Sequence, residues 1–227
     1  MTEQQAREEV CRVGKSLFER GYAHSTAGSI SVLLGEQCLI TPTDACLGFL
    51  QPEQLVLLGP DGAHAGPLAP SKTGAIHRAI YTASASTAWP ARCVIHTHSS
   101  SSVAVSMQAQ HPPGLAGVAE LLAPITPYFV MKVGHVPLIP YWRPGAPEMA
   151  QEMRRLIAQY AEQGLHLRAL MSARLGPSVW GANLGSAMAT LEELEETAKL
   201  WLLSAGAASA LDAVALSELR SVFGAYW

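Results

Sequence analysis

Two histidines separated by one residue are the strongest candidates for chemistry in this chain. His96 and His98 lie in the run Val94-Ile95-His96-Thr97-His98-Ser99. If this run forms a β-strand, its side chains alternate between faces, and both imidazoles point the same way, about 7 Å apart along the strand. Imidazole nitrogens bind divalent metals, so the spacing predicts part of a metal site.

The histidine pair alone does not complete a metal site. In 227 residues with 8 histidines, chance alone predicts roughly 0.3 pairs of this spacing. The alternative is a pair of strand histidines that hydrogen-bond to the backbone. The remaining histidines have no metal-type spacing to the pair; they are His24, His64, His77, His111, His135 and His166.

The composition is that of a globular protein without a nucleic-acid or membrane signature. Hydrophobic residues make up 49% of the chain, and 15 basic against 18 acidic side chains leave a net charge of −3. No basic stripe indicates nucleic acid, and no apolar run reaches the ~18 residues that a transmembrane helix needs. Met1 to Glu9 is polar and charged, which argues against a secretory signal. The scattered cysteines form no Cys-x-x-Cys motif, so we expect reduced thiols in a cytoplasmic protein.

Apolar periodicity and turn residues predict alternating helices and strands. Helices are predicted over 3–20, which Gly21 ends, and over 147–163. Ser71 is the predicted N-cap of another helix, and Thr190 with Glu193 forms a capping box for a helix through Leu203. The remaining predictions are a helix over 104–123, broken near 111–114, and strands over 30–34, 38–41, 55–58, 94–99, 128–133, 136–141 and 166–172. One α/β domain over residues 1–227 is the simplest arrangement.

Several short strings occur in one order along nearly the whole chain. They are Gly28-Ser29-Ile30-Ser31-Val32, Leu39-Ile40-Thr41-Pro42-Thr43, Pro70-Ser71-Lys72, the histidine run, Pro127-Tyr128-Phe129-Val130-Met131, Pro140-Tyr141-Trp142-Arg143-Pro144-Gly145 and Glu195-Glu196-Thr197-Ala198-Lys199-Leu200. In this order they resemble the class II aldolase/adducin family, and within it the 3-oxo-tetronate 4-phosphate decarboxylases. The resemblance implies a three-layer α/β/α fold with a central, mainly antiparallel sheet.

The resemblance also implies a metal-dependent carbon–carbon lyase acting on a small molecule. In that family three histidines hold a divalent metal, usually zinc, which polarises a carbonyl or enediolate oxygen. A glutamate beside the metal moves the proton. Backbone N–H groups and small polar residues bind a phosphate. Related enzymes are tetramers, so the resemblance implies a homotetramer, and His96 and His98 match the first two metal ligands.

Two positions depart from the family pattern. The third histidine normally precedes a glycine after the long amphipathic helix, and here Leu175 precedes Gly176. A leucine cannot coordinate a metal. The catalytic glutamate normally follows the Pro-Ser-Lys string, and here Thr73 follows it. A threonine hydroxyl is too weak an acid or base near neutral pH to replace that glutamate directly. We therefore expect a divalent metal, zinc or iron, to be weakly held or absent.

The remaining site predictions concern anion binding. Arg174 is next to the lost ligand position, so its guanidinium could replace the charge of a metal, although a surface arginine is the alternative. Asp44 would place a negative charge near a phosphate, which is unfavourable. The predicted catalytic residues are Lys72, Thr73 and Arg174. The predicted substrate-binding residues are Thr26, Gly28, Ser29, Thr43, Asp44, Ser71 and Tyr141.

Three functions remain open from the sequence. The expected one is a divergent lyase, of decarboxylase or retro-aldol type, acting on a small oxygenated carboxylate or a sugar-acid-like substrate. An iron-dependent oxygenase is a variant of it, although no carboxylate is evident beside the histidines. The second is a conventional metal-dependent 3-oxo-tetronate 4-phosphate decarboxylase or aldolase with an unseen ligand and base. The third is a non-catalytic or binding member of the family.

Overall fold

A seven-stranded sheet forms the centre of the molecule in the computed structural model, which describes residues 1–225 and 227. In chain order the helices and strands are α1 (Glu3–Glu19), β1 (Ser29–Leu34), β2 (Gln37–Ile40), β3 (Val56–Leu58), α2 (Gly74–Ser84), β4 (Cys93–His96), α3 (Ser100–Ser106), β5 (Leu138–Ile139), α4 (Pro147–Glu162), β6 (Ala169–Ser172), β7 (Gly176–Gly181), α5 (Leu184–Leu203) and α6 (Ala213–Phe223). A short π-helical segment, η4 (Phe129–Val133), precedes β5.

The sheet is mainly antiparallel, as the resemblance implied. Its strand order is β3-β2-β1-β4-β7-β6-β5, and only β5 and β6 run parallel. The central strand β4 lies between β1 and β7, so that His96 is opposite Ser29 on one side and Ser178 on the other. The histidine run therefore begins in the most enclosed part of the sheet.

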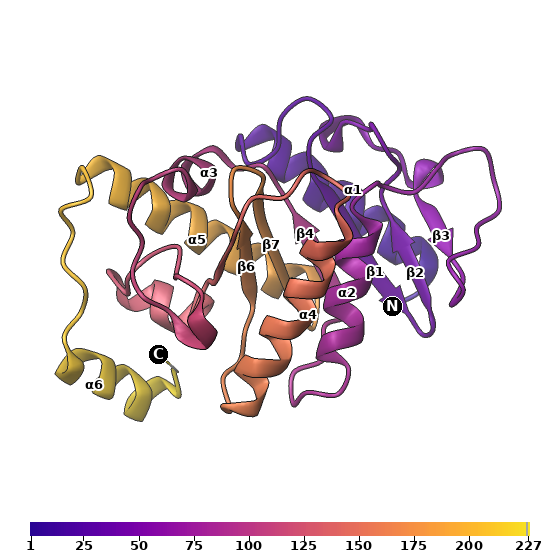
Figure 1. Ribbon diagram of the computed structural model, residues 1–227. Helices are drawn as coiled ribbons and strands as arrows, with labels where there is room; N and C mark the ends of the chain where they lie inside the picture. Colours follow the sequence, from indigo (N-terminus) through magenta and orange to yellow (C-terminus); the bar gives the residue numbers. More distant parts are fainter. Residues whose placement is uncertain (226) are drawn as a thin grey trace.

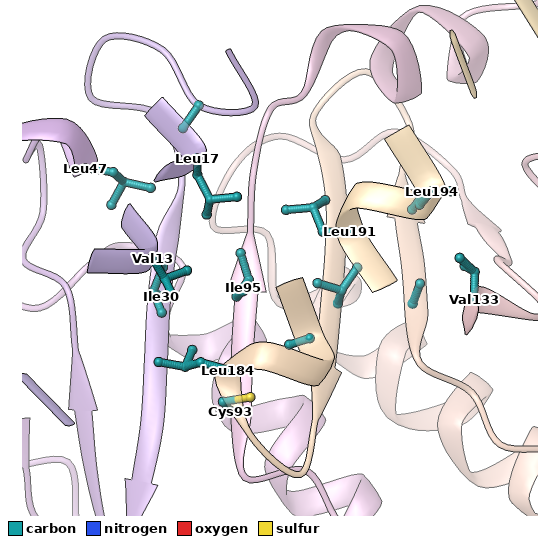
Figure 2. Packing of buried hydrophobic residues seen from close by; sticks show 14 of the residues in the cluster. Val13, Leu17, Ile30, Leu47, Cys93, Ile95, Val133, Leu184, Leu191 and Leu194 are labelled. Atoms are coloured by element: carbon teal, nitrogen blue, oxygen red, sulfur yellow. The ribbon is translucent and has the colours of Figure 1, made fainter. Parts of the chain in front are cut away.

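Helices cover both faces of the sheet, which gives the predicted three layers (Figure 1). One face packs against α1 and α5, and Figure 2 shows Val13, Leu17, Leu191 and other side chains of these helices meeting Ile95 and its strand neighbours. The other face packs against α2 and α4, where a second core includes Ile80, Met153 and Trp180. Alternation along β4 explains this division, because Val94 and Ile95 point to opposite faces.

Several local predictions are confirmed. The helix at the N-terminus begins after Thr2, whose side chain accepts from the backbone N–H of Gln5, and Gly21 follows it with a φ of 75°. Glycine adopts this left-handed conformation without the Cβ clash of other residues. The hairpin of β1 and β2 turns at Gly35-Glu36. No helix in residues 1–225 has the length and apolarity that would allow it to cross a bilayer.

Two predicted capping positions are wrong. The helix after the Pro-Ser-Lys string begins at Gly74 with Thr73, not Ser71, in the N-cap position. The last long helix begins at Leu184, because Asn183 and Ser186 form a capping box well before Thr190. Thr190 lies inside α5, where its hydroxyl bonds to the carbonyl of Ser186. Ser/Thr–x–x–Glu patterns also occur inside helices, so this motif alone does not locate a helix start.

The segment between β4 and α4 differs most from the prediction. The predicted helix over 104–123 ends at Ser106, since the following residues lead into the Pro112-Pro113-Gly114 loop. The predicted strand over 128–133 is helical, with Phe129, Val130 and Val133 buried on one side. Consequently β5 pairs with β6 and not with residues 128–133.

Three further elements differ from the prediction. The strand of the histidine run ends at His96, so His98 lies in the loop before α3. The strand predicted over 166–172 begins only at Ala169. The structure also contains β7 and α6, which periodicity did not indicate: β7 carries Gly176 and Pro177, both unusual in strands, at its start.

Candidate functional site

A cavity of about 390 Å³ opens beside the two histidines at the end of β4. Polar side chains reach it from one side, and apolar side chains of the β5–α4 loop and the first turns of α4 form the opposite wall. The lining residues are Lys72, Thr73, Ala75, Ile76, His96, His98, Pro144, Gly145, Ala146, Pro147, Met149, Ala150 and Leu175. The cavity can therefore bind a small molecule that has both polar and apolar contacts.

His96 is buried and held in one tautomer. Its Nδ1 lies 3.1 Å from the carbonyl oxygen of Pro177 and 3.1 Å from Oγ of Ser178. A carbonyl only accepts, so Nδ1 carries the proton and donates it to Pro177, which leaves Nε2 with a free lone pair. Burial is the main reason that the pKa of His96 is lowered to about 3. A neutral imidazole with a fixed tautomer is suited to act as a ligand or proton acceptor.

His98 is half-buried beside His96. The two ring centroids are 5.2 Å apart, with the rings nearly perpendicular. The pKa of His98 is lowered, first by burial and second by the charge of His24. The structure therefore brings together the two residues that the sequence predicted as metal ligands, although His98 lies in a loop and not in the strand.

The donor set beside the cavity is incomplete for a three-ligand metal site. Leu175 lines the cavity where the family pattern has its third histidine. Within residues 1–225 and 227, no group of three or more His, Cys, Asp or Glu side chains is arranged to hold a metal ion. As these side chains lie, they do not fit the group that the resemblance implies, so we derive no catalytic step through a metal.

Thr73 stands at the cavity end of a chain of hydroxyl groups. Its Oγ1 is 2.9 Å from Oγ of Ser71 and 2.6 Å from Oγ of Ser29. Ser29 in turn bonds to Nε2 of His77 at 2.8 Å. The Thr73 hydroxyl is therefore oriented by two serines, and one of them connects it to a buried imidazole.

His77 extends this network into the core. Its Nδ1 lies 2.7 Å from Oγ of Ser31, which also lies 2.7 Å from the hydroxyl of Tyr81. His77 is a packed residue of α2, as expected, and burial lowers its pKa to about 3. Burial likewise raises the pKa of Tyr81 well above its ordinary value. Every member is consequently neutral near pH 7, and the network can orient Thr73 but has no charged acid or base of its own.

A buried carboxylate holds the loop that carries His98. Glu195 on α5 accepts from the backbone N–H of Ser101 at 2.7 Å and that of Ser102 at 3.0 Å, and from Oγ of Ser102 at 2.7 Å. These donors belong to the first turn of α3, where N–H groups have no partner within the helix. Glu195 thus fixes the start of α3, and through it the loop that presents His98.

Two glycines allow the backbone to pass close to the histidines. At Gly176 (φ +146°) a Cβ would lie 1.9 Å from the carbonyl oxygen of Thr97, and at Gly28 (φ +96°) one would lie 3.0 Å from that of His96. Both φ values lie in the region that side chains disfavour. The predicted contact residue Gly28 therefore has a clear structural role here.

Lys72 places a positive charge at the rim of the cavity. Its ammonium is 3.2 Å from both carboxylate oxygens of Asp44, and both side chains are largely exposed. The N-terminus of α2 adjoins it, since Thr73 and Ala75 also line the cavity. A helix N-terminus attracts negative charge. The pairing with Asp44 partly neutralises Lys72 until a competing anion arrives.

The other predicted residues lie around the cavity or away from it. Ser29 and Ser71 are not in the cavity lining, but each forms a hydrogen bond with the Thr73 hydroxyl. Arg174 and Tyr141 are exposed and are not part of the cavity lining, and Arg174 has a left-handed backbone with a φ of 65°. Thr26 and Thr43 are likewise outside the lining. Sequence reasoning did not assign residues 144–150 to the cavity wall, although the Pro140–Gly145 string, quoted only for the family resemblance, includes the first two of them.

Comparison with known proteins gives a consistent match over the whole chain. A family model described as the Class II Aldolase and Adducin N-terminal domain matches residues 8–202. A 3-oxo-tetronate 4-phosphate decarboxylase from Cupriavidus necator is 45% identical, and the match covers 100% of this chain and 99% of that protein. A protein of the same name from Escherichia coli is 40% identical over 96% of this chain and 97% of its own.

Solved structures agree with these matches. YgbL from Klebsiella pneumoniae superposes with a TM-score of 0.83 and is 38% identical, with 97% of this chain and 100% of that chain covered. An L-fuculose 1-phosphate aldolase superposes with a TM-score of 0.76 at 21% identity, over 96% of this chain and 95% of its own. The second likeness bears on the fold alone.

Proposed function

This chain belongs to the class II aldolase and adducin family, and on that basis we propose that it is a lyase that decarboxylates a small 3-oxo acid. The relatives named 3-oxo-tetronate 4-phosphate decarboxylase support this proposal because they match nearly the full length of the chain. The cavity at His96 and His98 is large enough for a substrate of this size.

The observation that carries the choice of reaction is Thr73. A retro-aldol cleavage begins when a base removes the proton of a substrate hydroxyl. Decarboxylation of a 3-oxo acid needs no such base, because the substrate arrives as a carboxylate that has already lost its proton. A site with a threonine at this position, oriented by Ser71 and Ser29, is therefore better suited to decarboxylation than to aldol cleavage.

The proposed reaction requires the protein to stabilise an oxyanion and to supply a proton. The C1–C2 bond breaks, its electron pair forms a C2–C3 double bond, and negative charge develops on the C3 oxygen as CO₂ leaves. A proton, derived from water, must then be added to C2. We assign stabilisation of the oxyanion to Lys72 and the N-terminus of α2. We assign the positioning of the proton donor to the Thr73 hydroxyl and to His98.

Anion binding is a separate part of the proposal. Ser71 precedes Lys72 and Thr73 of the cavity lining and bonds to the Thr73 hydroxyl. Thr26, Thr43 and Ser71 remain our candidates for binding a substrate phosphate or carboxylate. Arg174 and Tyr141 would have to move to reach the same molecule, since both are exposed outside the lining. Lys72 would exchange Asp44 for the substrate anion.

We also propose that residues 1–227 form one domain and that the chain assembles into a homotetramer in the cytoplasm. The single sheet with helices on both faces supports the first point. Exposed apolar side chains near the C-terminus support the second; they include Leu203, Val214 and Phe223, with exposed fractions of 74%, 76% and 61%. Sedimentation at several protein concentrations would test the assembly.

The test of the activity is CO₂ release from 3-oxo-tetronate 4-phosphate, with and without added Zn²⁺. We expect one CO₂ for each dihydroxyacetone phosphate formed, and in D₂O one deuterium at the carbon that bore the carboxylate. A ketose 1-phosphate, assayed for aldehyde release, should react much more slowly. Turnover no faster than that of the Lys72→Ala variant, which lacks the assigned oxyanion charge, would contradict the proposal and favour a non-catalytic member of the family.

A further inference from the structure

A second cavity, of about 340 Å³, lies at the other end of the sheet from the histidine pair. It is bounded by residues just before β6, the end of β7, part of η4 and the first turns of α5, elements that lie next to one another in Figure 1. Along β4, His96 is opposite Ser178, whereas Cys93 is opposite Gly181 of the cavity lining. These two ends are about 10 Å apart along the strand. No residue lines both cavities, so the second one is a separate place on the molecule.

The lining of this second cavity is basic. Lys132 of η4 reaches it from one side, and His166 and Arg168 reach it from the segment before β6. None of the lining residues is an aspartate or a glutamate, although acidic side chains outnumber basic ones in the chain as a whole. Charges of one sign around a concave surface add to one another. The cavity is therefore suited to an anion.

Arg168 is the residue that most requires an anionic partner. Its side chain is partly withdrawn from solvent, and among the described residues its guanidinium forms no hydrogen bond or ion pair. Burial lowers the pKa of Arg168, and no nearby carboxylate opposes that effect. The group nevertheless stays protonated near pH 7 and has five N–H donors. Because a charge withdrawn from water without a partner is unfavourable, a bound anion would stabilise this arrangement.

His166 occupies a fixed position beside Arg168. Its ring is stacked on that of Trp89, with the centroids 4.8 Å apart and an angle of 8° between the planes. Burial, and then the charge of Arg168, lowers the pKa of His166 to about 4. The imidazole is therefore neutral near pH 7 and can donate a hydrogen bond from one nitrogen. The positive charges of the lining are consequently those of Lys132 and Arg168.

The backbone of Lys132 is held against α5. The hydroxyl of Thr190 lies 3.2 Å from the carbonyl oxygen of Lys132 and 3.2 Å from that of Ser186. Since Ser186 and Thr190 also line the cavity, this contact joins its two walls. The ammonium of Lys132 has no ion pair within residues 1–225 and 227. It can therefore turn toward a bound anion without losing a salt bridge.

We propose that this second cavity binds the phosphate group of a small phosphorylated molecule. The planar guanidinium of Arg168 would hold two phosphate oxygens, Lys132 would supply the second positive charge, and His166 would add a hydrogen bond. A phosphate monoester has close to two negative charges near pH 7, which matches two cations better than a single carboxylate does. The volume is within the range of small-molecule sites, so an esterified carbon chain also fits.

The test is calorimetric titration of the full-length protein with glycerol 3-phosphate and, separately, with inorganic phosphate. Both titrations use a Lys72→Ala background, which weakens anion binding in the candidate active site. In this background Arg168→Gln should weaken binding of glycerol 3-phosphate by at least about tenfold, because it removes charged hydrogen bonds. Arg154→Gln is the matched control: it removes the same charge from an exposed position on α4 outside the cavity lining, and it should leave the affinity unchanged.

Urea unfolding separates a ligand-binding arginine from a structural one. Without phosphate, Arg168→Gln should unfold at no lower urea concentration than its parent, because it removes a guanidinium that has no partner. With glycerol 3-phosphate added, the parent should gain more stability than Arg168→Gln does.

The two ligands identify the source of the phosphate. Tighter binding of glycerol 3-phosphate would support a phosphate ester, and equal affinity would support free phosphate at the same site. The proposal is overturned if neither ligand binds, if Arg168→Gln and Arg154→Gln bind equally well, or if Arg168→Gln is destabilised without phosphate. None of these results depends on decarboxylase activity, so failure of this proposal is distinguishable from failure of the proposed function.

Discussion

Replacing Ser31 by alanine tests whether the buried hydroxyl network exists as described. The Ser31 hydroxyl lies 2.7 Å from Nδ1 of His77 and 2.7 Å from the hydroxyl of Tyr81. Ser31 lies on β1 and the other two residues on α2, and all three side chains are buried, where water cannot replace the lost partner. Ser31→Ala removes a single oxygen, so it leaves little empty volume but takes a partner from two polar groups.

The expected loss of stability follows from those two groups. A buried donor or acceptor left without a partner costs about 1–3 kcal/mol, so the two together should lower the free energy of unfolding by about 2–6 kcal/mol. A small domain has only about 5–15 kcal/mol of stability in total. The variant should therefore unfold at a clearly lower urea concentration, with little change in the steepness of the transition.

Urea unfolding followed by tryptophan fluorescence, at one fixed protein concentration, would measure the loss. The matched control is Ser221→Ala on α6, whose exposed hydroxyl bonds only to the carbonyl of Glu218 in its own helix. That control should change stability by no more than about 0.5 kcal/mol. If Ser31→Ala were no more destabilising than Ser221→Ala, the network around His77 would not exist in solution, and our account of how Thr73 is oriented would be refuted.

Three further predictions concern the same region. The pKa of His77 is about 3 in the folded protein against an ordinary 6.5, so below pH 6.5 the unfolded chain binds a proton that the folded chain does not. The free energy of unfolding should therefore fall by about 1.4 kcal/mol between pH 7.5 and 5.5 on account of this residue. Urea unfolding of His77→Asn should show a correspondingly smaller dependence on pH. If wild type and His77→Asn lost the same stability over this range, the neutral buried His77 would be contradicted. Gly176→Ala should destabilise by about 3–5 kcal/mol, because its Cβ would meet the Thr97 carbonyl, and a loss below about 1 kcal/mol in urea would exclude that contact. Glu195→Gln should lower the melting temperature through a loss of about 1–3 kcal/mol and reduce decarboxylase turnover, whereas an unchanged melting curve would show that the anchor of α3 is unimportant.

Local sequence signals predicted the elements whose stability is local. The helix that Gly21 ends and the hairpin at Gly35-Glu36 were correct because helix-end and turn chemistry act over a few residues. The segment 128–133 was wrong because a short apolar run fits a strand or a helix equally well. Its helical form depends on burial of Phe129, Val130 and Val133 against the rest of the protein.

The candidate site shows the same division. The spacing of His96 and His98 indicated a pair of neighbouring imidazoles, and Pro-Ser-Lys followed by Thr73 placed a hydroxyl where the family pattern has a carboxylate. The structure brings these residues to one cavity, as expected. It also connects the predicted Ser29 to Thr73 and adds His77 and Glu195, through contacts between segments 44 to 94 residues apart. No periodicity within one segment could have indicated those contacts.

The sequence by itself determined the histidine pair and the presence of Thr73 and Leu175 where the family pattern has a glutamate and a histidine; the mainly antiparallel three-layer fold was implied by the resemblance to the family. These properties depend on residue types and on their order along the chain. Only the tertiary structure decided what surrounds the pair: the proton on His96 held by Pro177, the buried neutral His77 behind Thr73, and the exposed His24 beside His98. The reason is physical. Tautomer, desolvation and ligand spacing are set by which distant segments pack together, and packing is a property of the folded chain.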